Sequence, residues 1–307
     1  MAGGEFDFGG FVASRDRRAG GHEAGRVAYA YEGDRAMLRT LSKMPPITLA
    51  AAAVVRMYKR FLKNQYLGTT VRVSERQFPR IHAIATRCAE RLEVQAPTLY
   101  VANSPFLNAY TFGTQEDSFI VVHSALIDHF TEAELTFVIG HETGHIQNQH
   151  VVYGTLLHVL RTTASLLLRW ISPPIEVALL AWYRRAEITC DRAGLLCCGD
   201  IEVATKSFLK MATGSQKLYA ELDVEAYLSQ LEEGRRGLGR FTEAFASHPY
   251  LPKRVSALRL FTESALCREA LALGEGGLSM EEVDERTRDI IQILKSGAEK
   301  PAAESES

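Results

Sequence analysis

Two histidines and a glutamate in the stretch VIGHETGHIQ (138–147) have the types and spacing needed to bind and use a metal ion. His141 and His145 are four residues apart, so on a helix both imidazoles project from one face, separated by about 6 Å of rise. Glu142 is rotated by about 100° from His141, and its carboxylate can reach a water molecule on that ion. A pair of exposed helical histidines is the alternative, so the metal hypothesis requires a third ligand.

The stretch RRAEITCDRAG (184–194) offers a third ligand. Glu187 and Asp191 lie four residues apart on a helix face that is otherwise apolar, where carboxylates are costly unless they meet a cation or a donor. Ion pairing with neighbouring arginines is one explanation. Beside the histidine pair we favour another, in which two histidines and Glu187 bind zinc and leave the fourth position for water. Asp191 then accepts a hydrogen bond from the far nitrogen of a ligand imidazole.

Two helices must position these side chains. The first is predicted to begin after Thr131, which caps it, with Glu134 completing a capping box. The second is predicted between Ser172 and Gly199, which punctuate a long apolar-periodic run.

The remaining elements predict the fold class. A strand is predicted at 69–73 and a helix at 75–93, followed by three β-like runs at 98–102, 108–113 and 118–123. Everything after about residue 124 has a helical pattern. Strands early and helices late predict an α+β fold that is predominantly helical, with a small sheet whose edges are antiparallel.

Composition predicts the domain boundaries. Residues 1–35 are rich in glycine and charge and are predicted to be a flexible tail, as are residues 296–307. Residues 36–295 contain no internal repeat or long linker and are predicted to form one domain.

Charge, cysteine usage and hydropathy limit the function classes. A net charge of −2 argues against nucleic-acid partners, and five cysteines without a CxxC pair favour reduced thiols. No secretory signal and no apolar run of about 20 residues is apparent, so we expect no transmembrane segment and a cytoplasmic setting. The amphipathic stretch 155–170 is predicted to cover the core; the alternative is a helix resting on the inner face of a membrane, as peripheral contact.

Several motifs together resemble the HtpX and CAAX prenyl endopeptidase family of gluzincin zinc metallopeptidases. They are HETGH at 141–145, ExxxD at 187–191 and SHPYLPKRV at 247–255, and LNAYTFG at 107–113 looks like that family's active-site edge strand. The resemblance covers about residues 68–265 and implies a zincin-like peptidase domain. The best-known relatives are embedded in membranes, so the lack of a spanning segment here favours a soluble minimal member.

The resemblance also implies roles for individual residues. It implies one Zn²⁺ per chain, bound by His141, His145 and Glu187, with Glu142 as the general base. The implied activity is that of an endopeptidase, which hydrolyses peptide bonds in extended or unfolded polypeptide.

Four further residues receive roles through the resemblance alone. His248 and Arg254 match positions that face the oxyanion, where a donor stabilises developing charge. The main-chain groups of Asn108 and Ala109 would hold substrate as an added strand. From spacing alone, the first pair would be interpreted as a turn and a solvated helix residue.

Other functions and roles remain open at this stage. A zinc-bearing chaperone or adaptor would bind extended clients without turnover, although it has no need of a base such as Glu142. A third class is a hydrolase of another bond, such as an aminopeptidase or an esterase. Cys190, inside the ExxxD turn, is expected to be a buried inert thiol rather than a redox group. His22 in the tail can in principle reach the zinc and block it.

Overall fold

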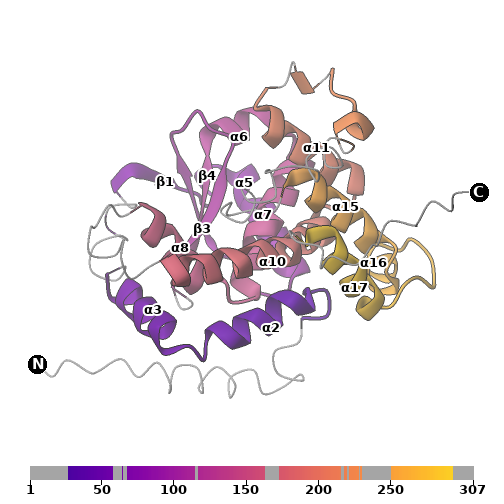
Figure 1. The fold of residues 1–307 in the computed structure, drawn as a ribbon. Coiled ribbons are helices and arrows are strands. Elements are labelled where there is room, and N and C mark those ends of the chain that lie inside the picture. Colours follow the sequence, from indigo (N-terminus) through magenta and orange to yellow (C-terminus); the bar gives the residue numbers. More distant parts are fainter. Residues whose placement is uncertain are drawn as a thin grey trace, which may run out of the picture.

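The computed structural model describes residues 27–57, 64, 68–114, 117–162, 173–215, 218–219, 221–227, 229 and 250–292. Figure 1 shows a small sheet beside a larger set of helices. The helices of the described residues are α2 (Glu32–Leu41), α3 (Pro45–Met57), α5 (Pro79–Arg91), α6 (Ser124–His129), α7 (Glu132–Gln147), α8 (Val151–Thr162), α10 (Pro173–Cys198), α11 (Ile201–Thr213), α15 (Leu251–Thr262), α16 (Ala265–Ala270) and α17 (Met280–Ile291). The predicted α+β class, predominantly helical, is confirmed.

The sheet has four strands in the order β1-β2-β4-β3. β1 (Thr70–Arg72) pairs with β2 (Thr98–Ala102) and β3 (Ala109–Gly113) pairs with β4 (Ser118–His123), both antiparallel, while β2 and β4 are parallel. The two edge pairs are therefore antiparallel, as the sequence predicts. β3 is an edge strand.

Helix α7 begins where the sequence predicts. The Thr131 hydroxyl accepts from the Glu134 N–H at 3.3 Å, and the Glu134 carboxylate accepts from the Thr131 N–H at 2.7 Å. This capping box satisfies two N–H groups that would otherwise lack helical partners. Because α7 contacts β3, β4, α5, α11 and α10, it is covered on most sides, which explains why its apolar and polar residues alike are buried.

Helix α10 joins two hydrophobic cores. Its first half packs with α2, α3 and α8 through Leu179, Leu180 and Trp182, and its last half joins the core beneath the sheet. In Figure 1, α2 (indigo) lies along one side of α10, and α3 lies beside α8. Glu187 and Asp191 fall between the two apolar halves, so the fold encloses a polar site at the junction of its cores.

Glycines let α7 and α10 approach closely. A Cβ added to Gly140 would lie 2.6 Å from the Cβ of Cys197, and one added to Gly144 would lie 2.7 Å from that of Ala193. A Cβ on Gly194 would lie 2.7 Å from the carbonyl oxygen of Phe137. These contacts are shorter than packed atoms adopt, so the close approach depends on the missing side chains.

Replacing Gly144 with alanine is expected to lower the free energy of unfolding by about 1–3 kcal/mol through overpacking. Alanine favours helix by about 1 kcal/mol over glycine, so intrinsic propensity alone predicts the opposite sign. Urea denaturation of Gly144→Ala measures the effect. Gly68→Ala is the control because a Cβ there would meet nothing within 4 Å. A stabilised Gly144→Ala protein would show that the interface between α7 and α10 can accommodate an added methyl group.

The predicted N-terminal boundary at residue 36 is wrong. Residues 27–35, assigned to the tail from composition, are packed against the helices, and α2 begins at Glu32. Tyr29, Tyr31 and Asp34 are 5%, 2% and 1% exposed. The Tyr29 hydroxyl donates to the side chain of Gln147, and its carbonyl accepts from Arg192 at 3.1 Å. Residues 1–26 and the predicted tail 296–307 lie outside the described residues.

The amphipathic stretch 155–170 is described as far as residue 162. There α8 buries Leu156 and Leu157 in the core that it forms with α2, α3 and the first half of α10. It exposes His158 and Arg161, as predicted for a helix that covers the core. Among all residues that the structure describes, no helix is both long and apolar enough to cross a membrane.

Candidate metal centre and active site

His141 and His145 on α7 face Glu187 on α10. The Nε2 atom of His141 lies 3.5 Å from Oε2 of Glu187, and Nε2 of His145 lies 3.4 Å from Oε1. All three ligand atoms fall within 4.8 Å of one another. Four-coordinate zinc with bonds of 2.0–2.2 Å places its ligand atoms about 3.3 Å apart. The side chains are therefore already at separations that suit zinc, and two imidazoles with one carboxylate suit its chemistry.

The far nitrogens of both histidines have separate partners. His141 Nδ1 lies 3.0 Å from Oδ1 of Asp191, and His145 Nδ1 lies 3.2 Å from Nδ1 of His150. A proton on Nδ1 of each ring leaves its Nε2 lone pair directed at the metal position. Asp191 thus lies where the sequence predicts a partner for a ligand imidazole.

Electrostatic surroundings differ between the two rings. Burial lowers the pKa of His145, which favours the neutral imidazole that a metal binds. Burial also lowers the pKa of His141, but the carboxylates of Glu187 and Asp191 outweigh it and hold this pKa above its usual value. The pocket of His141 therefore favours positive charge, which a bound cation would supply.

Arg254 on α15 contacts both carboxylates of α10. Its Nε lies 2.8 Å from Asp191 Oδ2, its Nη2 lies 2.5 Å from Oδ1, and its Nη1 lies 3.1 Å from Glu187 Oε2. Every nitrogen of the buried guanidinium thus faces a carboxylate. Burial alone lowers the pKa of Arg254, but Asp191 and Glu187 outweigh it and raise the pKa further above its usual value. In this geometry Arg254 anchors the metal-facing carboxylates, and the oxyanion role expected from the resemblance stays a prediction.

Glu142 is held by β3. The Thr111 hydroxyl lies 2.7 Å from Oε2 of Glu142 and 3.0 Å from its main-chain oxygen, and it can donate its one hydrogen to either. Glu142 is 7% exposed and follows His141 on α7. The strand thereby fixes the carboxylate beside the metal position without making it a ligand.

The edge strand β3 presents alternating main-chain groups. The Asn108 carbonyl accepts from the His123 N–H at 3.0 Å, so it points toward β4 rather than toward an added strand. Alternation along an antiparallel pair then turns the groups of Ala109 and Thr111 to the outer side. Gly113, next in this series, bonds outward to Thr155 of α8. The sequence prediction for Ala109 fits this geometry; the Asn108 carbonyl has another partner.

Two predicted residues fall outside the described residues: His248 and His22. Cys190 is fully buried, and burial raises the pKa of its thiol well above the usual value. A thiol that stays protonated and inaccessible fits the prediction of an inert group.

Sequence reasoning missed three residues of the site: Thr111, His150 and Tyr183. The Tyr183 ring stacks on that of His145, with centroids 5.5 Å apart and planes 10° from parallel. His150 carries a signal that was available, because it follows His145 by five residues just beyond the helix. Thr111 and Tyr183 carry none, since their contacts join distant segments.

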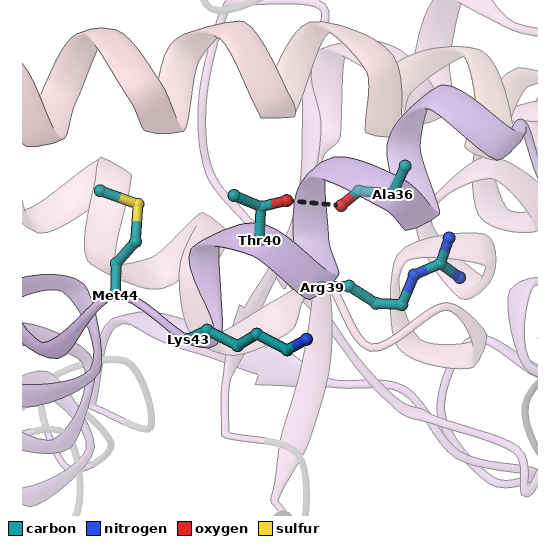
Figure 2. Close-up of a pocket in the computed structure, with 5 residues that line it drawn as sticks. All are labelled: Ala36, Arg39, Thr40, Lys43 and Met44. Atoms are coloured by element: carbon teal, nitrogen blue, oxygen red, sulfur yellow. Dashed lines mark hydrogen bonds between the residues drawn. The ribbon is translucent and has the colours of Figure 1, made fainter.

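A surface hollow lies apart from these side chains, beside α2 and the turn that follows it (Figure 2). The dashed line in Figure 2 marks the hydrogen bond that the Thr40 hydroxyl donates to the Ala36 carbonyl within the helix, at 3.0 Å. The lining contains two basic side chains and neither a metal ligand nor a candidate base, so it offers no rival site. The lining residues are Ala36, Arg39, Thr40, Lys43 and Met44.

Comparison with known proteins adds independent information. The model of peptidase family M48 matches residues 75–262. A protein of Arabidopsis thaliana named plastoglobule-localized metallopeptidase 48, chloroplastic, is 38% identical over 178 residues, which cover 57% of this chain and 52% of that protein. The chain therefore spans about half the length of this relative.

Bacterial proteins named for HtpX are also similar. A protease HtpX homolog of Moorella thermoacetica is 23% identical over 222 residues, covering 61% of this chain and 73% of that protein. Protease HtpX of Vibrio vulnificus is 28% identical over 210 residues, covering 57% and 70%. No solved structure shows a significant match.

Proposed function

The chain belongs to peptidase family M48, and from that premise we propose that it is a zinc-dependent endopeptidase acting on extended or unfolded polypeptide. The observation that carries this proposal is the mutual spacing of the His141, His145 and Glu187 ligand atoms, with Glu142 held beside them. One zinc per chain is expected at this position.

When bound, zinc would act as a Lewis acid that lowers the pKa of its bound water toward about 7 and polarises the substrate carbonyl. The chain's own residues do the rest. Glu142 takes a proton from the attacking water as the water oxygen bonds to the carbonyl carbon. It then passes that proton to the leaving nitrogen as the C–N bond breaks. Arg254 and Asp191 keep Glu187 and His141 in place during these steps.

Substrate is expected to bind as a strand along the outer side of β3. The outward main-chain groups of Ala109 and Thr111 would pair with peptide N–H and C=O groups, which every sequence possesses. Thr111 would then join the substrate strand to the base, because its side chain contacts Glu142. Recognition of this kind depends on extended backbone rather than on side chains, and it favours unfolded segments. The expected contribution of His248 to the oxyanion stays a prediction.

Replacing Thr111 with valine is expected to lower kcat by about tenfold and leave zinc bound. The hydroxyl can donate to the Glu142 carboxylate, and hydrogen bonds to carboxylates contribute about 1.5–3 kcal/mol; without this bond the base is less well oriented. Steady-state peptidase kinetics with zinc content measured in parallel give the result. Thr155→Val is the matched control, since that hydroxyl bonds to Gly113 of the same strand and not to Glu142. Equal kcat values for the two variants would remove Thr111 from the mechanism.

The proposed function is tested by zinc content and by cleavage of casein, an unfolded protein, before and after removal of metal with a chelator. We expect about one zinc per chain, cleavage at internal bonds, loss of cleavage with the metal and its return on adding zinc. Zinc binding without cleavage would instead support the chaperone or adaptor class. Release of single residues from the amino terminus would indicate an aminopeptidase.

A further inference from the structure

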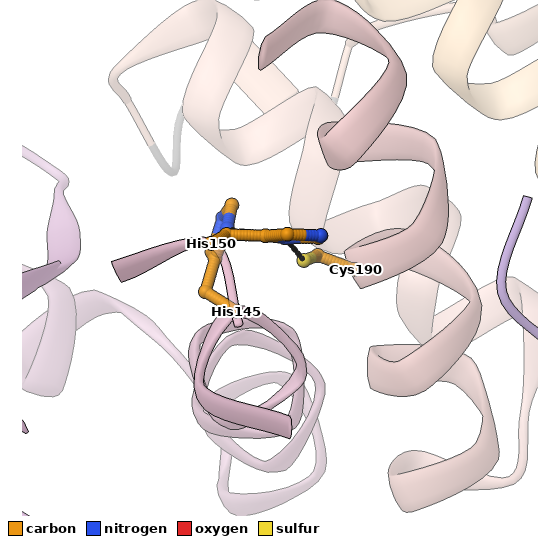
Figure 3. Close-up of side chains that lie close together, drawn as sticks. All are labelled: His145, His150 and Cys190. Carbon is orange, nitrogen blue, oxygen red and sulfur yellow. Dashed lines mark hydrogen bonds between the residues drawn. The ribbon is translucent and has the colours of Figure 1, made fainter. Parts of the chain in front are cut away.

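His150 is brought back against the metal ligand His145 by the end of α7. Gln149 adopts φ +66°, its N–H bonds to the Ile146 carbonyl at 3.2 Å, and the His150 N–H bonds to the His145 carbonyl at 2.9 Å. This pair of bonds is a Schellman motif, which reverses the chain after a helix. The two imidazoles therefore meet, with Nδ1 atoms 3.2 Å apart and ring centroids 5.3 Å apart (Figure 3).

The other side of His150 meets a buried carboxylate on α2. His150 Nε2 lies 3.0 Å from Oδ2 of Asp34. Asp34 also accepts from the Thr189 hydroxyl at 2.7 Å and from the Trp182 indole at 2.9 Å. Burial alone raises the pKa of Asp34, but His150, Thr189 and Trp182 outweigh it and hold this pKa below its usual value. Asp34 is thus an ionised group that only accepts hydrogen bonds.

An ionised Asp34 decides where the protons of both rings lie. A neutral His150 with its proton on Nε2 presents that proton beside the Asp34 carboxylate, 3.0 Å away, and this leaves a lone pair on its Nδ1. His145 can then donate from Nδ1 to that lone pair, and its own lone pair lies on Nε2, the atom 3.4 Å from Glu187.

We propose that Asp34 and His150 are positioning residues for the zinc ligand His145. They hold the proton on its Nδ1 and fix the direction of its Nε2, as Asp191 does directly for His141. This inference rests on the proposed zinc site. It extends the active site to α2, which lies before residues 75–262 of the family match.

A second metal ion is the competing explanation of the same side chains. His145, His150 and Cys190 also offer ligand atoms within 4.8 Å of one another, and Figure 3 shows them converging. Cys190 Sγ lies 3.6 Å from His150 Nδ1. That site would require His145 to give up its Nδ1 proton and Cys190 its thiol proton, inside a region already holding Glu187 and Asp34. The series of contacts from His145 through His150 to Asp34 requires neither proton to be lost. It also accounts for Asp34, which a second metal ion would leave unexplained.

The test is zinc affinity, measured by competition with a chromophoric chelator on the full chain. Asp34→Asn is expected to raise the zinc Kd by about 10–100-fold, because an amide has one accepting oxygen for three donors. His150→Leu is expected to do the same. In His150→Asn the amide oxygen takes the place of Nδ1 and can accept from His145, so part of the affinity should return.

Two matched controls separate positioning from a general loss of structure. Asp284→Asn alters another buried carboxylate that holds α2, since Asp284 accepts from the Glu32 N–H at 2.8 Å and pairs with Arg192. It should lower stability without changing the zinc Kd. Cys190→Ser should also leave the zinc Kd and stoichiometry unchanged. Imidazole ¹⁵N NMR of the zinc-loaded protein gives a second readout, and should show His145 protonated at Nδ1 and His150 at Nε2.

Three results would distinguish the positioning role from a second metal ion and from failure of the proposed zinc site. An Asp34→Asn Kd within twofold of the native value, with native zinc bound, overturns the positioning role alone. Two zinc ions per chain, falling to one in Cys190→Ser, overturn it in favour of the second metal. Failure of the native chain to bind zinc overturns the proposed function, and this inference with it.

Discussion

Glu142→Gln is expected to lower kcat for casein-derived peptides by about 10²–10⁴-fold while one zinc per chain stays bound. Glutamine preserves size and can still accept the Thr111 hydrogen bond through its amide oxygen, so the local packing should survive. It cannot take a proton from water. Because Glu142 is not among the three ligand side chains, metal content should not change.

A fluorogenic peptide assay and metal analysis on the same samples measure both quantities. Glu132→Gln is the matched control, since that glutamate is half-exposed at the start of the same helix and pairs with Arg87 on the surface. A Glu142→Gln protein that retains more than about a tenth of native kcat would assign proton transfer to another group.

The second large effect concerns stability. Arg254→Leu is expected to lower the free energy of unfolding by about 3–5 kcal/mol, since it leaves buried charge uncompensated. Asp191 would lose its bidentate partner and Glu187 its contact at 3.1 Å, and the guanidinium would no longer pack 4.8 Å above the Phe208 ring. Denaturant unfolding of zinc-free protein gives the value without a contribution from the metal.

Arg259→Leu provides the comparison for that variant. Arg259 lies on the same helix, but its ion pair with Glu225 at 3.0 Å is on the surface. Exposed pairs contribute about 0–1 kcal/mol, so the two variants should differ several-fold. Similar losses for both would mean that Arg254 does not anchor the carboxylates as its distances indicate.

The metal-facing residues were predictable because their relations are local in sequence. The four-residue spacing of His141 and His145 fixes their common face once a helix is assumed, and the Thr131 capping signal supports that helix. Glu187 needed one further step, the cost of a carboxylate on a buried helix face. The strands of the small sheet were predicted from short β-rich runs between turn residues, and their order came only with the structure.

The supporting residues were not predictable in the same way. The partners of Arg254, Thr111 and Asp34 lie on other elements, and no local period records a contact between segments so far apart. Asp34 was also assigned to a tail, because the composition of residues 1–35 is rich in glycine and charge, although α2 begins at Glu32. Its burial depends on the ion-pair contact with His150 at 3.0 Å and on hydrogen bonds from Trp182 and Thr189 of α10.

The most direct test of the central claim is the position of zinc in crystals of the zinc-loaded Glu142→Gln protein, located by anomalous scattering at the zinc edge. The proposal predicts one peak about 2.0–2.2 Å from His141 Nε2, His145 Nε2 and a carboxylate oxygen of Glu187. A peak centred on His150 and Cys190 instead, or none near α7, would contradict it.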